Sequence, residues 1–274
     1  MTGPSVSEVS TWKTSWAFNM WPSLYYYFSE DQLPINVLMV FLVLSTILFT
    51  VGIWTNLAAL FMYVLWYSIA LRNGLAHNGE DGMMRFALFY AIFIPYGYSL
   101  SLRNYLRRKR GLLCQNTFTP FVLRLLQINV VLVYFFSLPY KIIDDFAWVD
   151  GTAIYYTTLN TRWGLSPEGI WLATAFGGWL IPILTYWTLF CEGAFVLFVW
   201  FKKTRLIVCI LLAQLHFGIA MSLENTTWFN IAALLNILTF IKKEDYLFLL
   251  SIFYTFTLFL RGLSNDVRNY FKRL

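Results

Sequence analysis

Lys141 is the residue whose type and position most directly suggest chemistry. It ends an apolar run, residues 118–140, and an acidic, aromatic stretch follows it at 144–150. An ammonium group beside hydrocarbon must snorkel to the interface, pair with an anion, or lose its proton. Desolvation favours the neutral amine, which is a base, whereas neighbouring carboxylates favour the ammonium. Snorkelling, pairing and base catalysis therefore stay open as alternatives for Lys141.

Other polar residues lie inside apolar runs, where polar groups are candidates for function. Glu192 lies in the run 179–201, and His216 in the run 206–222. Glu192 is expected to face the interior and pair with Arg or His, which by itself would only join helices. A lone His in an apolar helix is often a hydrogen-bonded packing residue, so His216 has two interpretations as well. The remaining supporting candidates are His77, Asn78, Arg85 and Asp150, and two further polar residues, Arg124 and Gln127, precede Lys141 in its own run.

Composition determines the class of fold. The chain of 274 residues is 59% hydrophobic and only 12% charged, where soluble domains carry about 25% charged residues. Aromatic residues make up 20%, which suits a protein with many membrane–water interfaces. The apolar runs are continuous rather than alternating, so an outer-membrane barrel is disfavoured. We predict an all-α, polytopic bundle of transmembrane helices in the cell membrane, with the lipid bilayer as its main partner.

About eight spans are expected from the apolar runs. They fall at 34–54, 57–71, 83–100, 118–140, 179–201, 206–222, 228–241 and 246–261. Around them we expect an aromatic interfacial segment at 1–33, a transmembrane domain at 34–262 and a basic tail at 263–274. Several runs are shorter than the usual twenty residues, so the sequence does not fix the boundaries of the spans or their exact number.

The charges predict an orientation. Basic clusters lie in three short loops, at 101–110, 202–205 and 242–245, and positive loops stay cytoplasmic. The loop 141–170 then lies outside, together with both termini. An outward basic tail is not explained by this rule. No folded basic face is evident, so nucleic acid is not an expected partner, and the three cysteines have no metal-binding spacing.

Known catalytic motifs are missing from the sequence. It contains no hydrolase elbow, no phosphate-binding glycine loop and no zinc-protease helix. Asp144 and Asp145 are adjacent, so they do not naturally converge as an acid–base pair. Spacing alone therefore names no reaction.

Three blocks in order resemble one family. The first is Leu-Arg-Asn-Gly-Leu-Ala-His-Asn-Gly-Glu-Asp-Gly-Met-Met-Arg at 71–85, with Phe-Ile-Pro-Tyr-Gly-Tyr-Ser at 93–99. The second runs from Leu-Gln-Ile at 126–128 through Lys141 to Trp-Val-Asp-Gly at 148–151, and the third is Glu192 with His216. In this pattern the chain resembles the bacterial HTTM domain, which is related to vitamin K-dependent gamma-carboxylase. The resemblance covers most of residues 34–240.

The resemblance implies a helical membrane domain whose reactive face is non-cytoplasmic. A lysine matching Lys141 would be the base in the oxygenation of vitamin K hydroquinone, and His216 matches another interior polar position. A further family histidine would fall near His77 or Asn78. The cofactor stays unknown, with vitamin K or another quinone-like molecule implied by the family. This sequence has no counterpart of the carboxylase's long lumenal region, and the family's first helix is expected to be missing, so carboxylation of glutamate is not expected.

Two hypotheses follow from these observations. In the first, the protein is an intramembrane enzyme, carboxylase- or epoxidase-like, that acts on a quinone-like or peptide substrate. Lys141 is its base and His216 and Glu192 shape the site. In the second, it is a non-catalytic maturation partner or chaperone for a secreted peptide, a toxin or another membrane protein, because some bacterial relatives act in maturing secreted peptide toxins. Convergence of Lys141, His216 and Glu192 on one pocket would favour the enzyme.

Overall fold

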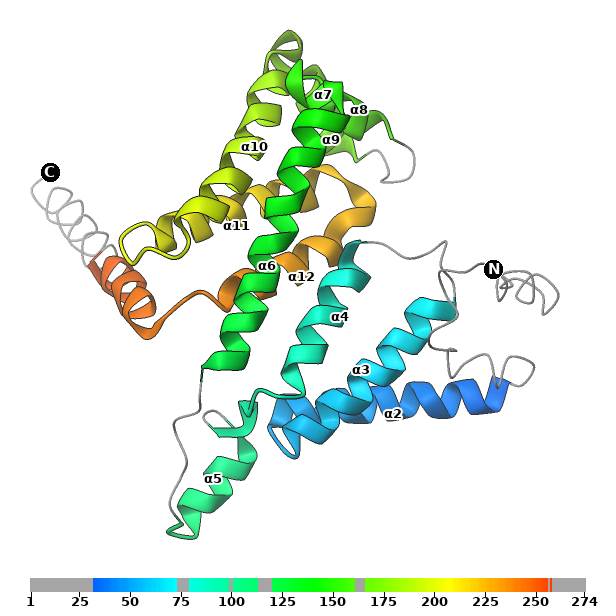
Figure 1. Ribbon diagram of the computed structural model, residues 1–274, viewed down its shortest axis with the longest axis vertical. Coiled ribbons are helices and arrows are strands. Elements are labelled where there is room, and N and C mark those ends of the chain that lie inside the picture. Colours follow the sequence, from blue (N-terminus) through cyan, green and yellow to red (C-terminus); the bar gives the residue numbers. More distant parts are fainter. Residues whose placement is uncertain are drawn as a thin grey trace, which may run out of the picture.

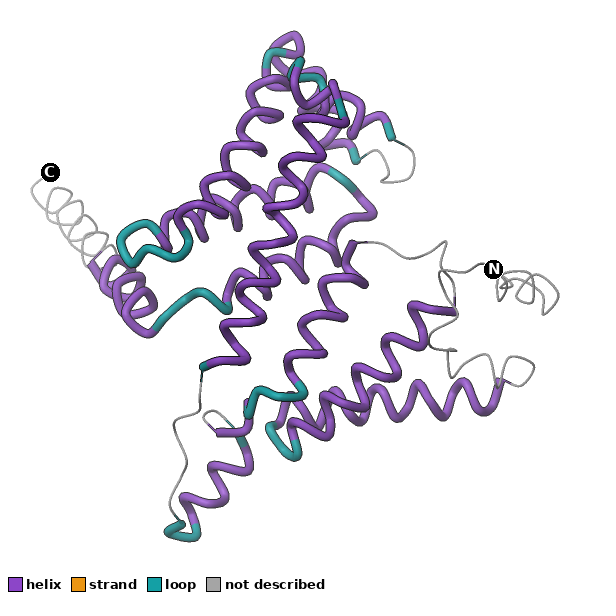
Figure 2. The backbone as a smooth tube through the Cα atoms, in the orientation of Figure 1, coloured by secondary structure: helices purple, strands orange, loops and turns teal. Residues whose placement is uncertain are grey.

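The fold is helical throughout the part of the chain that the structure describes. The computed structural model describes residues 32–72, 79–98, 101–112, 120–160, 166–255 and 257, and no strand occurs among them (Figure 2). The predicted all-α class is confirmed. The candidates His77 and Asn78, the basic tail 263–274 and nearly all of the expected segment 1–33 lie outside the described residues.

The first described helices form a hairpin. α2 (Gln32–Val51) and α3 (Thr55–Arg72) pack against each other (Figure 1). Gly52 makes the turn between them with φ +81°, a left-handed conformation that glycine adopts without steric cost. A Cβ at Gly52 would also collide with Ser101, so this turn needs glycine for a second reason.

α4 (Gly79–Ala91) packs on α3 and leads into a 3₁₀ turn, η3 (Tyr96–Tyr98), and a short helix, α5 (Leu102–Lys109). The Ser101 hydroxyl caps α5 by accepting a hydrogen bond from the Asn104 N–H. α5 projects at the lower end of the molecule in Figure 1.

α6 (Phe121–Pro139) is the central helix of the molecule (Figure 1). It contacts α4, α10 (Leu180–Phe198) and α12 (Thr227–Leu238), and α11 (Arg205–Ser222) packs between α10 and α12. The main apolar core forms where these helices meet. Its largest fully buried side chains are Phe195, Phe240, Leu126 and Leu212.

The stretch expected to be a loop, 141–170, is largely helical instead. After the π turn η4 (Tyr140–Asp144) it forms α7 (Phe146–Val149) and α8 (Ala153–Leu159), and α9 (Pro167–Thr174) closes the group. These helices are only four to eight residues long, so they are too short to show the sustained apolar periodicity that would predict a helix from the sequence. Side-chain caps start α7 and α9, whereas α8 has no such cap. Ser166 accepts the Gly169 N–H, and Pro167 stands at the first helical position.

Three helices are long and apolar enough to cross a membrane: Phe121–Asp144, Leu180–Phe198 and Arg205–Ser222. Ile35–Val51 and Thr55–Ala70 are apolar but shorter. The expected count of eight spans is not confirmed. α4 has 13 residues and α12 has 12. At 1.5 Å per residue each is about 20 Å long, well short of the ~30 Å hydrocarbon layer.

Candidate functional site

One face of α6 carries the polar groups that matter for the site. Tyr134, Ser137 and Lys141 follow one another at spacings of three and four, which puts them on one side of a helix. Pro139 removes a backbone donor just before Lys141, and the helix widens there into the π turn Tyr140–Asp144. Such turns within α-helices are frequent at functional sites.

Lys141 pairs with Glu192 across the α6–α10 contact. Its Nζ lies 2.5 Å from Glu192 Oε1, and the Ser137 hydroxyl donates to Oε2 at 3.4 Å. The two side chains are only 16% and 9% exposed. Glu192 therefore faces the interior as predicted, but its partner is a lysine rather than the expected Arg or His.

The Trp148 ring lies over the Lys141 amine. Lys141 Nζ lies 4.6 Å from the ring centroid, within range of a cation–π interaction. The expected position beside Trp148 is confirmed. The neighbouring carboxylates have other roles: Asp145 accepts the Ala147 N–H and caps α7, while Asp150 Oδ1 accepts from the backbone N–H and hydroxyl of Thr152. Within the described residues Lys141 forms its ion pair with Glu192 and none with the acidic turn.

The segment bearing Trp148 is fastened to the start of α10. Gly151 has φ +80°, and a Cβ there would lie 2.9 Å from Pro182 Cβ and 3.2 Å from Tyr186 Cε2. The Tyr186 hydroxyl donates to the carbonyl of Val149, the residue directly after Trp148, at 2.9 Å. Both the Glu192 carboxylate and the Trp148 ring are thus positioned by α10.

His216 belongs to a second, neighbouring network. Asn230 donates through Nδ2 to the backbone and hydroxyl oxygens of Thr226, so its Oδ1 accepts from His216 Nδ1 at 2.8 Å. The other ring nitrogen, Nε2, then accepts from the Tyr134 hydroxyl at 2.8 Å. His216 is 3% exposed, and both nitrogens are engaged.

The two networks lie one helical turn apart on α6 without merging. Lys141 and Glu192 meet directly, whereas the contacts of His216 are with Tyr134, Asn230 and the Phe229 ring. Only part of the expected convergence is therefore present. The environment of His216 is that of a hydrogen-bonded packing residue, and its assignment as catalytic stays an untested prediction.

Arg85 lies away from both networks. Its guanidinium is 5.6 Å from the ring centroid of Tyr67 on α3, so α4 packs on α3 partly through a cation–π contact, and it is 5.3 Å from that of its α4 neighbour Phe86. No described contact joins it to Lys141 or Glu192.

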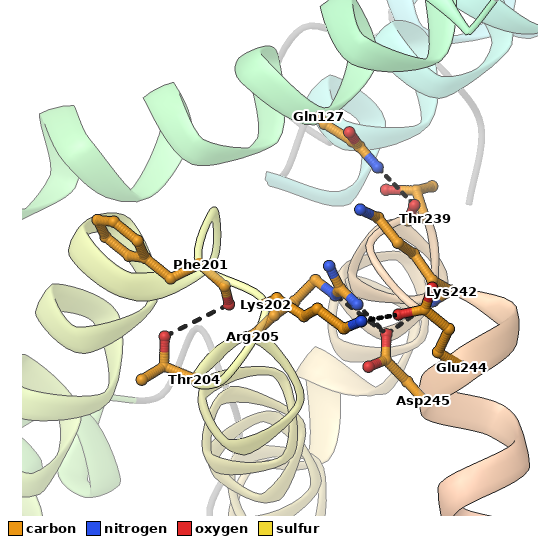
Figure 3. A network of polar contacts seen from close by, with 9 residues as sticks. All are labelled: Gln127, Phe201, Lys202, Thr204, Arg205, Thr239, Lys242, Glu244 and Asp245. Atoms are coloured by element: carbon orange, nitrogen blue, oxygen red, sulfur yellow. Dashed lines mark hydrogen bonds and ion pairs between the residues drawn. The ribbon is translucent and has the colours of Figure 1, made fainter.

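Sequence reasoning missed a buried ion pair at the opposite end of α6. Arg205 was read as a cytoplasmic loop charge, yet it is 3% exposed and donates through Nε and a terminal nitrogen to Asp245 Oδ2 at 3.0 and 2.7 Å (Figure 3). The same oxygen accepts the Lys242 N–H at 2.9 Å. This is half of a capping box, three residues into the helical segment that starts at 243.

Gln127 joins this region to α12. Its Nε2 donates to the Thr239 carbonyl at 2.6 Å, and its Oε1 accepts from Arg124 (Figure 3). The exposed pair Lys202–Glu244 lies beside the buried one. A sequence signal existed, because Lys-Lys-Glu-Asp at 242–245 is typical of a helix start, but nothing in it identified Arg205 as the partner.

An apolar groove of about 440 Å³ is lined by Ile128, Val131, Leu132 and Trp200. Leu132 precedes Lys141 by nine residues along α6, a rise of roughly 13 Å. This groove is therefore separate from the Lys141–Glu192 pair. Within the described residues no three His, Cys, Asp or Glu side chains gather as metal ligands.

The Lys141–Glu192 pair supports two kinds of behaviour. A proton passed from Nζ to Oε1 converts ammonium and carboxylate into a neutral amine and a carboxylic acid, and the amine is then a base. Without that transfer, the same pair simply holds α6 to α10.

Comparison of the chain with models of protein families, with curated proteins and with solved structures finds no match. The resemblance to the HTTM domain therefore stays a prediction, and the site has to be interpreted from its own geometry.

Proposed function

We propose that the chain is a multi-pass protein of the cell membrane, with α5 and the loop 202–205 cytoplasmic and Lys141 near the outer interface. Support comes from the three helices of membrane-spanning length and composition. It also comes from exposed aromatic side chains around the outer end, such as Phe146, Trp171 and Trp179, in the manner of an interfacial belt.

Lys141 and Glu192 are proposed as the acid–base centre of an intramembrane enzyme. The observation that carries this proposal is the position of the amine between the Glu192 carboxylate and the Trp148 ring, largely sheltered from solvent, at the end of a span. Ionisable residues at membrane depth are costly and therefore mark functional sites. The substrate class is a lipid-soluble hydroquinone, which the family resemblance suggests.

The proposed step consists of two successive proton transfers. Glu192 takes a proton from the Lys141 ammonium, and the neutral amine then takes the proton of a phenolic hydroxyl, leaving the hydroquinone anion. The Trp148 ring face stabilises the ammonium that forms again. The Ser137 hydroxyl holds the second carboxylate oxygen and so fixes the direction of the first.

The rate at which oxygen oxidises a hydroquinone tests this proposal. The hydroquinone anion reacts with oxygen faster than the neutral hydroquinone, so a base that forms the anion accelerates the oxidation. The purified chain in lipid nanodiscs is expected to accelerate oxidation of vitamin K hydroquinone, followed by absorbance. Lys141→Arg keeps the charge but cannot release its proton, so the acceleration should fall by about 10²-fold or more, the usual contribution of a general base. Lys203→Arg, at an exposed lysine of the other end, is the matched control.

Full acceleration by the Lys141→Arg variant would refute the lysine base. Glu192→Gln gives an independent check, because an amide cannot take the proton. The Glu192→Gln variant should lose the acceleration of hydroquinone oxidation. Its melting temperature shows whether it remains folded. No acceleration by the wild-type protein would refute the hydroquinone chemistry altogether.

A second candidate is a non-catalytic partner that helps a secreted peptide to mature. The observation in its favour is that the charged groups are already satisfied: Lys141 by Glu192, and both nitrogens of His216 by Tyr134 and Asn230. The exposed aromatic side chains of the outer end would then hold the peptide. This candidate predicts that Lys141→Arg preserves function.

A further inference from the structure

α5 combines two properties that rarely occur together on a helix exposed to water. Its cations and the next residue make a dense positive cluster: Arg103, Arg107, Arg108, Lys109 and Arg110, all of them exposed. Among the described elements it packs mainly on η3, and it projects at the end of the molecule opposite α7 and α8 (Figure 1). The cluster is therefore presented outward from the helical body.

The apolar side chains of α5 are also exposed. Leu102, Tyr105 and Leu106 are 40%, 62% and 41% exposed, and their spacing of three and four puts them on one face. Asn104, which is buried, faces the body instead. A short helix with an apolar face and flanking cations is the pattern of a helix that lies in the plane of a membrane interface.

The base of α5 is surrounded by exposed aromatic side chains. Trp54, Phe93 and Tyr96 are 67%, 54% and 43% exposed. The Ser101 hydroxyl, donating to the Gly97 carbonyl at 2.6 Å and capping α5, ties the helix to this group. Aromatic residues of this kind concentrate at the level of lipid headgroups.

The backbone conformation of Trp54 also bears on the placement of these aromatic side chains at the headgroup level. It has φ +48°, a left-handed conformation that is uncommon for a bulky residue. Gly or Asn would adopt this conformation more easily, so the backbone of this turn does not itself call for a Trp. An indole at the interface gives a physical reason for keeping it.

We propose that α5 lies in the headgroup layer of the cytoplasmic leaflet and binds the phosphates of anionic phospholipids, with Leu102, Tyr105 and Leu106 inserted among the upper acyl carbons. This inference rests on the proposed membrane placement of the chain. Juxtamembrane cations are attracted to anionic lipid, and the arginine guanidinium pairs with phosphate through two parallel hydrogen bonds. Lys109, which follows Tyr105 by four residues and so lies on the apolar face at the last residue of α5, reaches the same phosphates by snorkelling.

The test follows the surroundings of Tyr105 in the full chain. Tyr105→Cys, in a Cys114→Ser background, is labelled with an environment-sensitive fluorophore, and the protein is placed in nanodiscs of phosphatidylcholine with or without phosphatidylglycerol. The emission is expected to shift to the blue when phosphatidylglycerol is present. Adding salt should reverse the shift, because screening weakens the phosphate contacts.

Two sets of substitutions distinguish the effect of the α5 cations from the effect of the protein's total positive charge. The triple variant Arg103→Gln, Arg108→Gln and Arg110→Gln should lose the shift. The matched triple variant Lys203→Gln, Lys242→Gln and Lys243→Gln removes three exposed cations elsewhere and should keep it.

An emission that is the same in both lipid mixtures overturns the inference, as does a shift that survives in the α5 variant. Failure of the membrane placement gives a different result, because the chain would then be extracted from cell membranes by alkaline carbonate.

Discussion

At the scale of single residues, charges that enter the helical body are matched by a partner from another helix. Lys141 of the α6 end pairs with Glu192 of α10, and Arg205 of α11 pairs with Asp245. Burying an ion is costly, and removing one partner leaves the other uncompensated. Each pair therefore fixes which helices lie side by side, whatever else it does.

The hydrogen-bond network at His216 gives a prediction about the cost of leaving a buried polar group without its partner. Tyr134→Phe removes the hydroxyl that donates to His216 Nε2 and leaves a buried lone pair without a partner. The free energy of unfolding should fall by about 1–3 kcal/mol, the usual cost of an unsatisfied buried group. Thermal unfolding in detergent measures it. Tyr186→Phe loses a hydroxyl on a half-exposed side chain and should change stability much less, and equal losses in the two variants would contradict the assignment.

The sequence predicted the residues of the site better than their pairing. An amine after an apolar run, followed by Trp148, correctly predicted a lysine beside an indole. The partner Glu192 was named as an interior residue, but periodicity does not say which helix its side chain faces, so Arg or His was expected. Arg205 was missed because its position in a basic loop resembles a topology signal. Its burial depends on Asp245, in a helix forty residues later, which the local sequence does not indicate.

At the scale of elements, long apolar runs were easy to predict and short polar helices were not. α2, α6, α10 and α11 follow apolar runs seen in the sequence. α7 and α9 begin at side-chain caps. α8 and α9 are held by contacts with α10 and α11, such as the Ser166 hydroxyl donating to the Ser222 carbonyl at 2.7 Å. These contacts come from distant parts of the chain, so a local pattern does not predict them.

The start of the helical segment at 243 offers a prediction with a pH dependence. Burial by itself raises the pKa of the Asp245 carboxyl, but the Lys242 N–H and the Arg205 guanidinium outweigh it and hold the pKa below its usual range. A pKa lowered in the folded state contributes stability that is present above the unfolded value, about 3.9. That stability is lost as the pH falls through the lower, folded pKa.

Asp245→Asn should therefore destabilise the protein at neutral pH, and its difference from wild type should shrink as the pH falls toward acid. Unfolding curves of both proteins across this range, in one detergent, give the comparison. Glu244→Gln, which breaks the exposed pair with Lys202, should change stability little at any pH. A difference for Asp245→Asn that does not vary with pH would show that the carboxylate charge is not what stabilises this helix start.

At the scale of the whole molecule, the two ends differ in character. One end has the cationic helix α5 with Trp54 at its base, and the other has α7, α8 and α9 with the Lys141–Glu192 pair beneath Trp148 (Figure 1). α6 runs from the α7–α9 end toward the α5 end (Figure 1). The proposed orientation, with positive charge in the cytoplasm and the acid–base pair outside, assigns a side to each end.

Cysteine labelling tests this orientation across one helix. Glu168 of α9 and Lys203 are both exposed, and α10 lies between them. In a background with Cys114, Cys191 and Cys209 replaced by Ala, Glu168→Cys should react with a membrane-impermeant maleimide in intact cells. Lys203→Cys should react only after lysis, because positive loops are retained in the cytoplasm. The opposite pattern would invert the orientation, and labelling of both sites in intact cells would mean that α10 does not cross the membrane.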